Sequence, residues 1–103
     1  MRIIETEAEY DQLLKENTSV FIDFYADWCG PCKMAAPIVE ALSELYPGVA
    51  FAKVNVDDVP EVAERYGVMS IPTMIAIKNG EVVKTSIGFV PQDSLEKVVK
   101  AAL

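Results

Sequence analysis

The chain has 103 residues, of which 51% are hydrophobic and 24% are charged, a composition typical of a folded globular domain rather than a disordered segment. Sixteen acidic residues against nine basic ones give a net charge of −7, which repels phosphate backbones and argues against nucleic acid as a partner. No apolar run approaches the roughly 20 residues of a membrane helix, and the chain turns acidic before a signal peptide could form. We therefore expect one domain over residues 1–103, cytoplasmic and without membrane association.

The first elements predicted along the chain are a short strand, a capped helix and a buried strand. Arg2–Glu5 has the length of a short edge strand. Thr6 and Glu9 form a capping box, in which each side chain binds a free backbone amide at the start of a helix. Val20–Ala26 is a nearly continuous apolar run, which favours a central strand covered on both faces.

A second helix and a further buried strand follow. The helical pattern begins at Pro31 and ends where Pro47 and Gly48 interrupt it. Its apolar positions share one face, which we expect to point inward: Ala35, Ile38, Val39, Leu42, Leu45 and Tyr46. Val49–Val56 then has the composition of a second buried strand.

The remaining pattern predicts a short helix, a hairpin and a last helix. Asp57 and Asp58 offer an acidic cap to a helix that begins near Pro60 and ends at Gly67. The hairpin consists of strands Thr73–Lys78 and Glu81–Ser86 joined by Asn79-Gly80, a strong signal for a two-residue turn, and Pro91 opens the last helix. That helix should face inward with Leu95, Val98, Val99 and Ala102. Together these elements predict an α/β fold, a mixed central sheet with a parallel N-terminal part, a C-terminal antiparallel hairpin and helices on both faces.

The two cysteines, Cys29 and Cys32, lie at the predicted start of the second helix. In a regular helix, Cβ atoms three residues apart are separated by about 5 to 6 Å, whereas a disulfide needs about 3.8 Å. Cys29 should therefore cap the helix, with Cys32 in its first turn and Pro31 where a missing N–H is no loss. Free amides and the helix dipole then favour the Cys29 thiolate, which predicts Cys29 as the attacking nucleophile and Cys32 as the resolving thiol.

Other interpretations of the cysteine pair remain open. The chain contains no histidine and no third cysteine, so a zinc or iron–sulfur site would need ligands from a second copy of the chain. A purely structural disulfide closing so short a loop would constrain the unfolded chain little. A redox-active dithiol without a metal is the leading hypothesis. A metal-bridging dimer and an interaction module that does not use its cysteines are the alternatives.

Several motifs together resemble the thioredoxin family. In chain order they are Phe24-Tyr25-Ala26-Asp27-Trp28, Cys29-Gly30-Pro31-Cys32-Lys33, Lys53-Val54-Asn55-Val56-Asp57, Ile71-Pro72-Thr73, Lys78-Asn79-Gly80-Glu81 and Gly88. The resemblance extends from about residue 2 to the C-terminus. It implies the thioredoxin fold and a protein dithiol/disulfide oxidoreductase that reduces target proteins through a reversible Cys29–Cys32 disulfide. It also implies a monomer without a bound cofactor, recycled by a flavoprotein reductase of the thioredoxin reductase type.

Two charged residues of predicted strands complete the proposed chemistry. Asp23 interrupts an apolar strand, so it should be partnered or protonated unless it faces water at an edge. The family keeps a buried aspartate at this place, and the resemblance therefore implies that Asp23 transfers the Cys32 proton, through a water. Lys53 resembles the family lysine that favours the ionised carboxylate, although a lysine on a strand could equally be a solvated edge residue.

The resemblance also implies a surface for protein substrates. Sequence alone favours a trans Ile71-Pro72 bond, whereas the family has a cis proline against the disulfide, which leaves the Ile71 backbone free to pair with an extended substrate. The further substrate-binding residues are Gly30 and Pro31 of the motif, an apolar rim of Trp28, Met69, Ile71 and Phe89, and Gly88, where the backbone should approach the site. Met69 and Phe89 could instead fill the core. Tyr25, Met69-Ser70 and Pro91 depart from the commonest family pattern.

Overall fold

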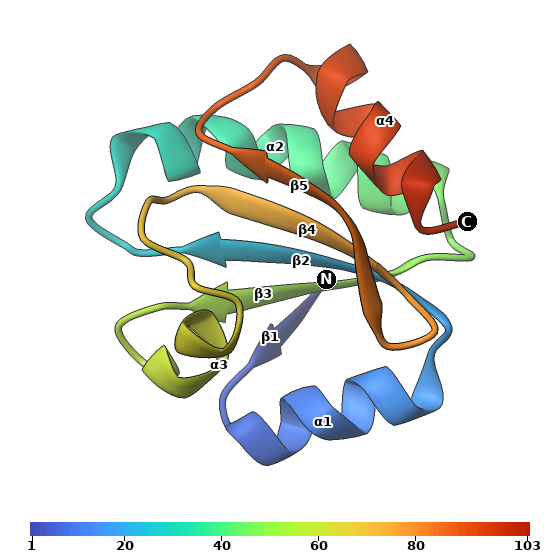
Figure 1. The fold of residues 1–103 in the computed structure, drawn as a ribbon. Coiled ribbons are helices and arrows are strands. Elements are labelled where there is room, and N and C mark those ends of the chain that lie inside the picture. The colour runs from blue at the N-terminus through green and yellow to red at the C-terminus, as the bar shows by residue number, and fades with distance from the viewer.

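The computed structural model describes residues 1–103 and places nine elements along the chain (Figure 1). They are β1 (Arg2–Ile4), α1 (Glu7–Glu16), β2 (Ser19–Tyr25), α2 (Gly30–Leu45), β3 (Ala50–Asn55), α3 (Pro60–Arg65), β4 (Thr73–Lys78), β5 (Glu81–Ile87) and α4 (Gln92–Ala101). Each element lies within a few residues of its predicted position. None of the helices combines the length and the apolar character that crossing a membrane requires.

The five strands form one mixed sheet in the order β1-β3-β2-β4-β5. β3 runs parallel to both β1 and β2, whereas β4 runs antiparallel to both β2 and β5. β2 is therefore the central strand, as its apolar composition predicts, and β1 lies at an edge. This is the predicted α/β architecture, a parallel N-terminal part followed by an antiparallel hairpin.

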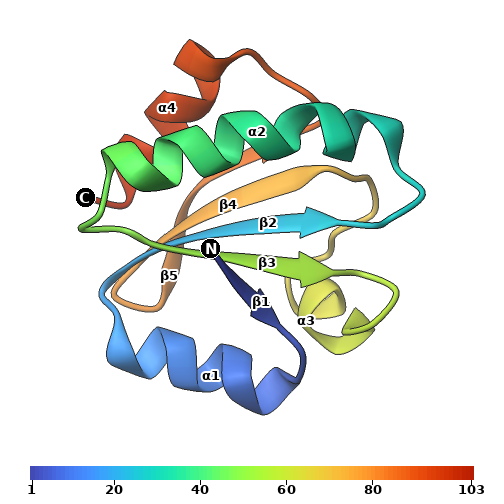
Figure 2. The same cartoon turned by 180° about the vertical axis from the view of Figure 1, so that it is seen from behind.

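Helices cover both faces of the sheet, with α2 and α4 on one side and α1 and α3 on the other (Figures 1 and 2). Alternate residues of β2 enter the two cores, since successive side chains of a strand point to opposite faces. Ile22 and Phe24 pack in the core beneath α1 and α3, whereas Phe21 packs beneath α2 and α4 and stacks on Phe51. Asp23, two residues after Phe21, therefore points toward α2.

Of the two predicted helix caps, the one at α1 is present in part and the one at α3 is absent. Thr6 does cap α1, because its hydroxyl accepts a hydrogen bond from the Glu9 N–H at 3.1 Å. The return bond from the Glu9 carboxylate is absent, and that carboxylate lies 4.0 Å from the Arg2 guanidinium instead. The acidic cap predicted for α3 is wrong: Val59 occupies the capping position and no side chain caps the helix.

The turns follow backbone requirements that the sequence indicates. Asn79 and Gly80 both have positive φ, 52° and 81°, as a two-residue hairpin turn with the twist of the strands needs. The prediction that Leu45 faces inward is wrong, because α2 ends there and Leu45 stays exposed. The chain turns at Tyr46, which packs on the core and donates a hydrogen bond to Glu96 of α4.

Candidate active site

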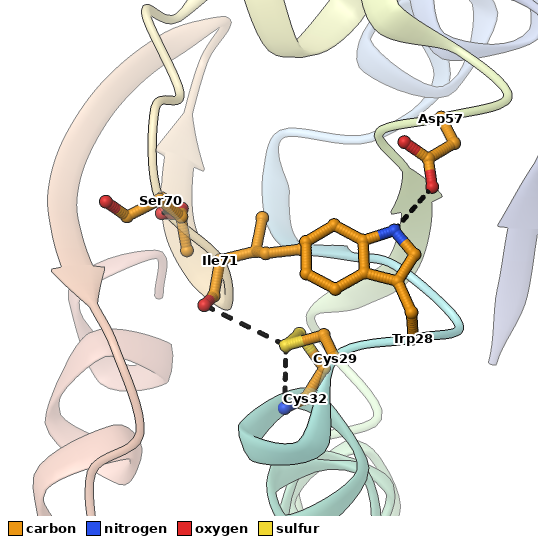
Figure 3. Close-up of a disulfide and its surroundings, with 7 residues drawn as sticks. Trp28, Cys29, Cys32, Asp57, Ser70 and Ile71 are labelled. Atoms are coloured by element: carbon orange, nitrogen blue, oxygen red, sulfur yellow. Dashed lines mark hydrogen bonds between the residues drawn. A yellow bond between two sulfur atoms is a disulfide. The ribbon is translucent and has the colours of Figure 1, made fainter.

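The cysteine pair occupies the N-terminus of α2 and forms a disulfide (Figure 3). Cys29 is the capping residue, with an extended backbone (φ −88°, ψ 109°), and Pro31 lies in the first turn. The non-helical backbone at Cys29 brings the two Cα atoms to 5.2 Å, within the usual range for a disulfide. The Cys32 N–H donates to the Cys29 sulfur at 3.2 Å, so a free helix amide does point at this atom. The helix start therefore has the predicted geometry.

The two sulfur atoms face different surroundings, although both cysteines are buried. Cys29 Sγ lies 3.9 Å from the carbonyl oxygen of Ile71, on the loop before β4 (Figure 3). The Ile71-Pro72 bond is cis, as the resemblance implies, and the Pro72 carbonyl accepts a hydrogen bond from the Gly88 N–H at 2.8 Å. The loop that contains Ile71 and Pro72 thus contacts Cys29, and Gly88 binds that loop.

Gly88 is needed here for a different reason from the one predicted. A Cβ atom built at this position would meet nothing within 4 Å, so crowding does not exclude a larger residue. Its φ of +84° does, because this conformation is unfavourable for residues with a side chain. The left-handed backbone turns the Gly88 N–H toward the loop that contacts Cys29.

Asp23 is buried beneath α2 at the centre of the sheet. Asp23 is 2% exposed, and its Oδ1 atom has no hydrogen-bond partner. The alternative of a solvated edge position is therefore wrong. Burial raises the pKa of Asp23 to about 6, and the charge of Lys53 opposes that rise. A carboxyl group in this state can both accept and release a proton near neutral pH.

A cavity of about 130 Å³ connects Asp23 with Cys32. Its lining comprises Asp23, Tyr25, Ala26, Asp27, Cys32, Lys33, Ala36 and Lys53. The volume is enough for water, and both Asp23 and Cys32 line it. The structure therefore brings together three of the four predicted catalytic residues around one cavity, with Cys29 across the disulfide.

Lys53 lies next to Asp23 on the neighbouring strand, and its ammonium group is held over an aromatic ring. The two residues are register partners of β2 and β3, and β3 lies between β1 and β2, so Lys53 is not on an edge strand. Lys53 Nζ is 4.3 Å from the centre of the Tyr25 ring. Burial, followed by the charge of Asp27, raises the pKa of Tyr25, so its hydroxyl is neutral at physiological pH.

The apolar side chains predicted to form a substrate rim are exposed or half-buried. Trp28 is 70% exposed and its indole N–H donates to Asp57 Oδ2 at 2.8 Å (Figure 3). Met69 is 96% and Phe89 42% exposed, so the alternative that they fill the core is wrong. Ile71 is half-buried beside the sulfur, and Gly30 and Pro31 lie on the exposed side of the helix start.

A second, larger cavity has a volume of about 450 Å³ and shares Met69 with the predicted substrate rim. It opens between the loop after α3 and the uncovered face of β5, where its lining includes Tyr66, Met69 and Ile87. Neither cysteine lines it, and all its lining residues are uncharged. Size therefore does not indicate the reactive site in this molecule.

Known proteins resemble this chain in sequence and in the fold that places the cysteine pair at the start of α2. The family model described as Thioredoxin matches residues 2–101. The chain belongs to the thioredoxin family. It is 47% identical to the thioredoxin of Bacillus subtilis over 97 residues, which cover 90% of this chain and 93% of that protein. The structure of Plasmodium falciparum thioredoxin matches over the whole of both chains, with a TM-score of 0.93 and 38% identity. Fasciola hepatica thioredoxin matches equally fully, with a TM-score of 0.93 and 39% identity.

Membership of the thioredoxin family decides between the interpretations of the cysteine pair. The chain is a protein disulfide reductase of the thioredoxin type, and Cys29–Cys32 is its redox-active disulfide. The redox interpretation drawn from the spacing of the cysteines is confirmed.

Sequence reasoning missed two contacts of the site. Asp57 binds the Trp28 indole instead of capping α3, and a contact across 29 positions leaves no local signal. At Tyr25 the sequence departs from the commonest family pattern, and the resemblance gives this residue no role in the site. Its position two residues after Asp23 places both side chains on one face of β2, which is the signal that could have connected it with the carboxylate.

Proposed function

We propose that this thioredoxin reduces target proteins by two successive exchanges in which Cys29 attacks and Cys32 resolves. The Cys29 thiolate attacks one sulfur of a substrate disulfide, forms a mixed disulfide and releases the first substrate thiolate. Cys32 then loses its proton, and its thiolate attacks Cys29 Sγ and releases the second substrate thiolate. The substrate gains two electrons, and the Cys29–Cys32 disulfide that the structure contains is the oxidised product.

The observation that carries this assignment is the hydrogen bond from the Cys32 N–H to Cys29 Sγ at 3.2 Å. At a helix N-terminus this amide and the helix dipole stabilise negative charge on the Cys29 sulfur, which favours the thiolate. Cys32 has no such amide, and it lines the cavity that it shares with Asp23. The nucleophile is thus the cysteine whose charge the helix start stabilises.

We further propose that Asp23 takes the Cys32 proton and returns it when the dithiol is restored, with Lys53 favouring the ionised carboxylate. Asp23 and Cys32 line one cavity, and its volume permits a water between them. A pKa of about 6 lets the carboxylate accept a proton near neutral pH without holding it permanently. Two acids line this cavity, and of these Asp23 is buried whereas Asp27 is exposed.

The substrate in this proposal lies across the disulfide as an extended segment. Trp28, Met69, Ile71 and Phe89 supply apolar contacts, with Gly30, Pro31, Pro72 and Gly88 forming the backbone around the sulfur. The hydrogen bond to Asp57 restrains the Trp28 indole, which reduces the entropy lost when a substrate binds.

Two cysteine variants test the order of the exchanges. Cys32→Ser should attack a disulfide substrate and remain trapped in the mixed disulfide, whereas Cys29→Ser should form none. Insulin reduction and mass spectrometry of the products are the measurements. Trapping by Cys29→Ser instead would reverse the assignment, and full cellular activity of Cys29→Ser would favour the interaction module.

The partners proposed are disulfide-containing target proteins and a flavoprotein reductase that restores the dithiol. We place the protein in the cytoplasm, acting as a monomer over residues 1–103, because a dithiol reductant needs a compartment that keeps thiols reduced. A coupled assay with a flavoprotein reductase and its electron donor should sustain turnover. Failure with every reductase of the source cell would contradict this part of the proposal.

A further inference from the structure

Tyr25 lies where it can control the position of Lys53. Asp23 and Tyr25 share the α2-facing side of β2, and their register partners on β3 are Lys53 and Asn55. The four side chains thus form a two-by-two array on one face of adjacent strands. Within it Lys53 Nζ extends along the sheet to the Tyr25 ring, 4.3 Å from its centre.

The ring is a specific contact for the Lys53 ammonium group. Lys53 forms no ion pair, with Asp23 or with any other carboxylate, and its side chain is half-buried. A lysine ammonium is strongly hydrated and sits on a flexible stem, so without the ring it would extend into solvent. The face of an aromatic ring attracts a cation, and the neutral hydroxyl of Tyr25 adds no charge of its own.

We propose that Tyr25 is a positioning residue, which uses its ring to hold the Lys53 ammonium group beside Asp23 and thereby sets how readily Asp23 accepts the proton of Cys32. This inference rests on the proton-transfer role proposed for Asp23. It gives a function to the tyrosine at which the chain departs from the commonest family pattern. Tyr25 packs against the cluster of Ala26, Cys29 and Cys32, but it exchanges no proton or electron in this mechanism, and its effect on Asp23 passes through Lys53.

Other charged groups lie near Asp23 and Tyr25. α2 contributes Lys33 to the cavity, and the segment before α2 contributes Asp27. Asp58 acts on Tyr25 from the loop after β3. β4, on the opposite side of Asp23, contributes the uncharged Met74 as register partner. A change at Tyr25 therefore reaches Asp23 through Lys53 or through access of water to the cavity.

A double-mutant cycle separates these two routes. Tyr25→Leu keeps an apolar cover and removes the ring, Tyr25→Phe keeps the ring, and each is made with Lys53 and with Lys53→Met. The Asp23 carboxyl carbon is titrated by NMR in the oxidised proteins, in which the cysteines do not titrate. Tyr25→Leu should raise the Asp23 pKa by about half a unit when Lys53 is present and not in the Lys53→Met background. Tyr25→Phe should leave it unchanged in both.

Two outcomes would overturn the proposal. An equal shift by Tyr25→Leu with and without Lys53 would mean that Tyr25 only covers the cavity. A shift by Tyr25→Phe as large as that by Tyr25→Leu would assign the effect to the hydroxyl. The titration needs no turnover, so it tests Tyr25 separately from catalysis. If Asp23→Asn resolves mixed disulfides at the normal rate, the proton-transfer role fails whatever the titration shows.

Discussion

Replacing Asp23 by asparagine removes a carboxyl group that the fold buries with one oxygen unpartnered. Burial raises the pKa of Asp23 from 3.8 to about 6, so the folded protein binds this proton more tightly than the unfolded chain does. The free energy of unfolding therefore falls as the pH rises from about 4 to about 6, and stays lowered above that range. A rise of about two pKa units corresponds to roughly 3 kcal/mol.

Asp23→Asn should abolish this loss, because asparagine does not ionise. The free energy of unfolding of the variant, relative to that of the original protein, should therefore rise by about 3 kcal/mol when the pH is raised from about 3.5 to about 8. Any cost of burying the amide is present at both pH values and cancels in the comparison. Urea unfolding of the oxidised proteins, with the disulfide intact, measures the difference.

An exposed acid provides the control for this experiment. Glu44 lies on the solvent side of α2, and Glu44→Gln should change stability by less than about 0.5 kcal/mol at either pH. If the advantage of Asp23→Asn is the same at both pH values, or is larger at the acidic one, burial is not what perturbs Asp23. The account of its proton chemistry would then lose its physical basis.

Three further changes test other parts of the site. Lys53→Met should raise the pKa of Asp23 above about 6, since the lysine charge opposes the effect of burial, and carboxyl NMR titration measures the shift. Asp57→Ala should free the Trp28 indole, raise its mobility in fluorescence anisotropy and lower kcat/KM for insulin about 3- to 10-fold. Gly88→Ala should cost about 1 to 2 kcal/mol in urea unfolding, because alanine must adopt a φ of +84°.

Matched variants show whether these effects have the stated cause. Asp57→Asn keeps an oxygen acceptor and should retain most of the activity that Asp57→Ala loses. Gly48 has neither a positive φ nor a neighbour near its missing Cβ, so Gly48→Ala should not destabilise the protein. A loss at Gly48 as large as that at Gly88 would contradict the backbone explanation. An Asp23 pKa unchanged in Lys53→Met would show that the lysine charge does not reach the carboxyl.

Much of the fold and of the reactive centre could be predicted from local sequence patterns. The apolar run around Phe24 predicts a central strand, Asn79-Gly80 predicts the hairpin, and the spacing of Cys29 and Cys32 at a helix start predicts the capping geometry. Each of these rests on interactions within a few residues, such as backbone φ preferences and the free amides of a helix N-terminus.

Only the tertiary structure decided which segments far apart in the chain contact one another. Asp57 binds Trp28 instead of capping α3, Ile71 places its carbonyl oxygen beside Cys29, and Leu45 stays outside the core. Such contacts depend on which strands become neighbours and where each helix ends on the sheet, and neither is a property of a short stretch of sequence. The spacing of Cys29 and Cys32 at a helix start by itself predicted the capping geometry and made a redox pair the leading hypothesis. The packing of β2, β3 and α2 determined that a buried carboxylate shares a cavity with Cys32.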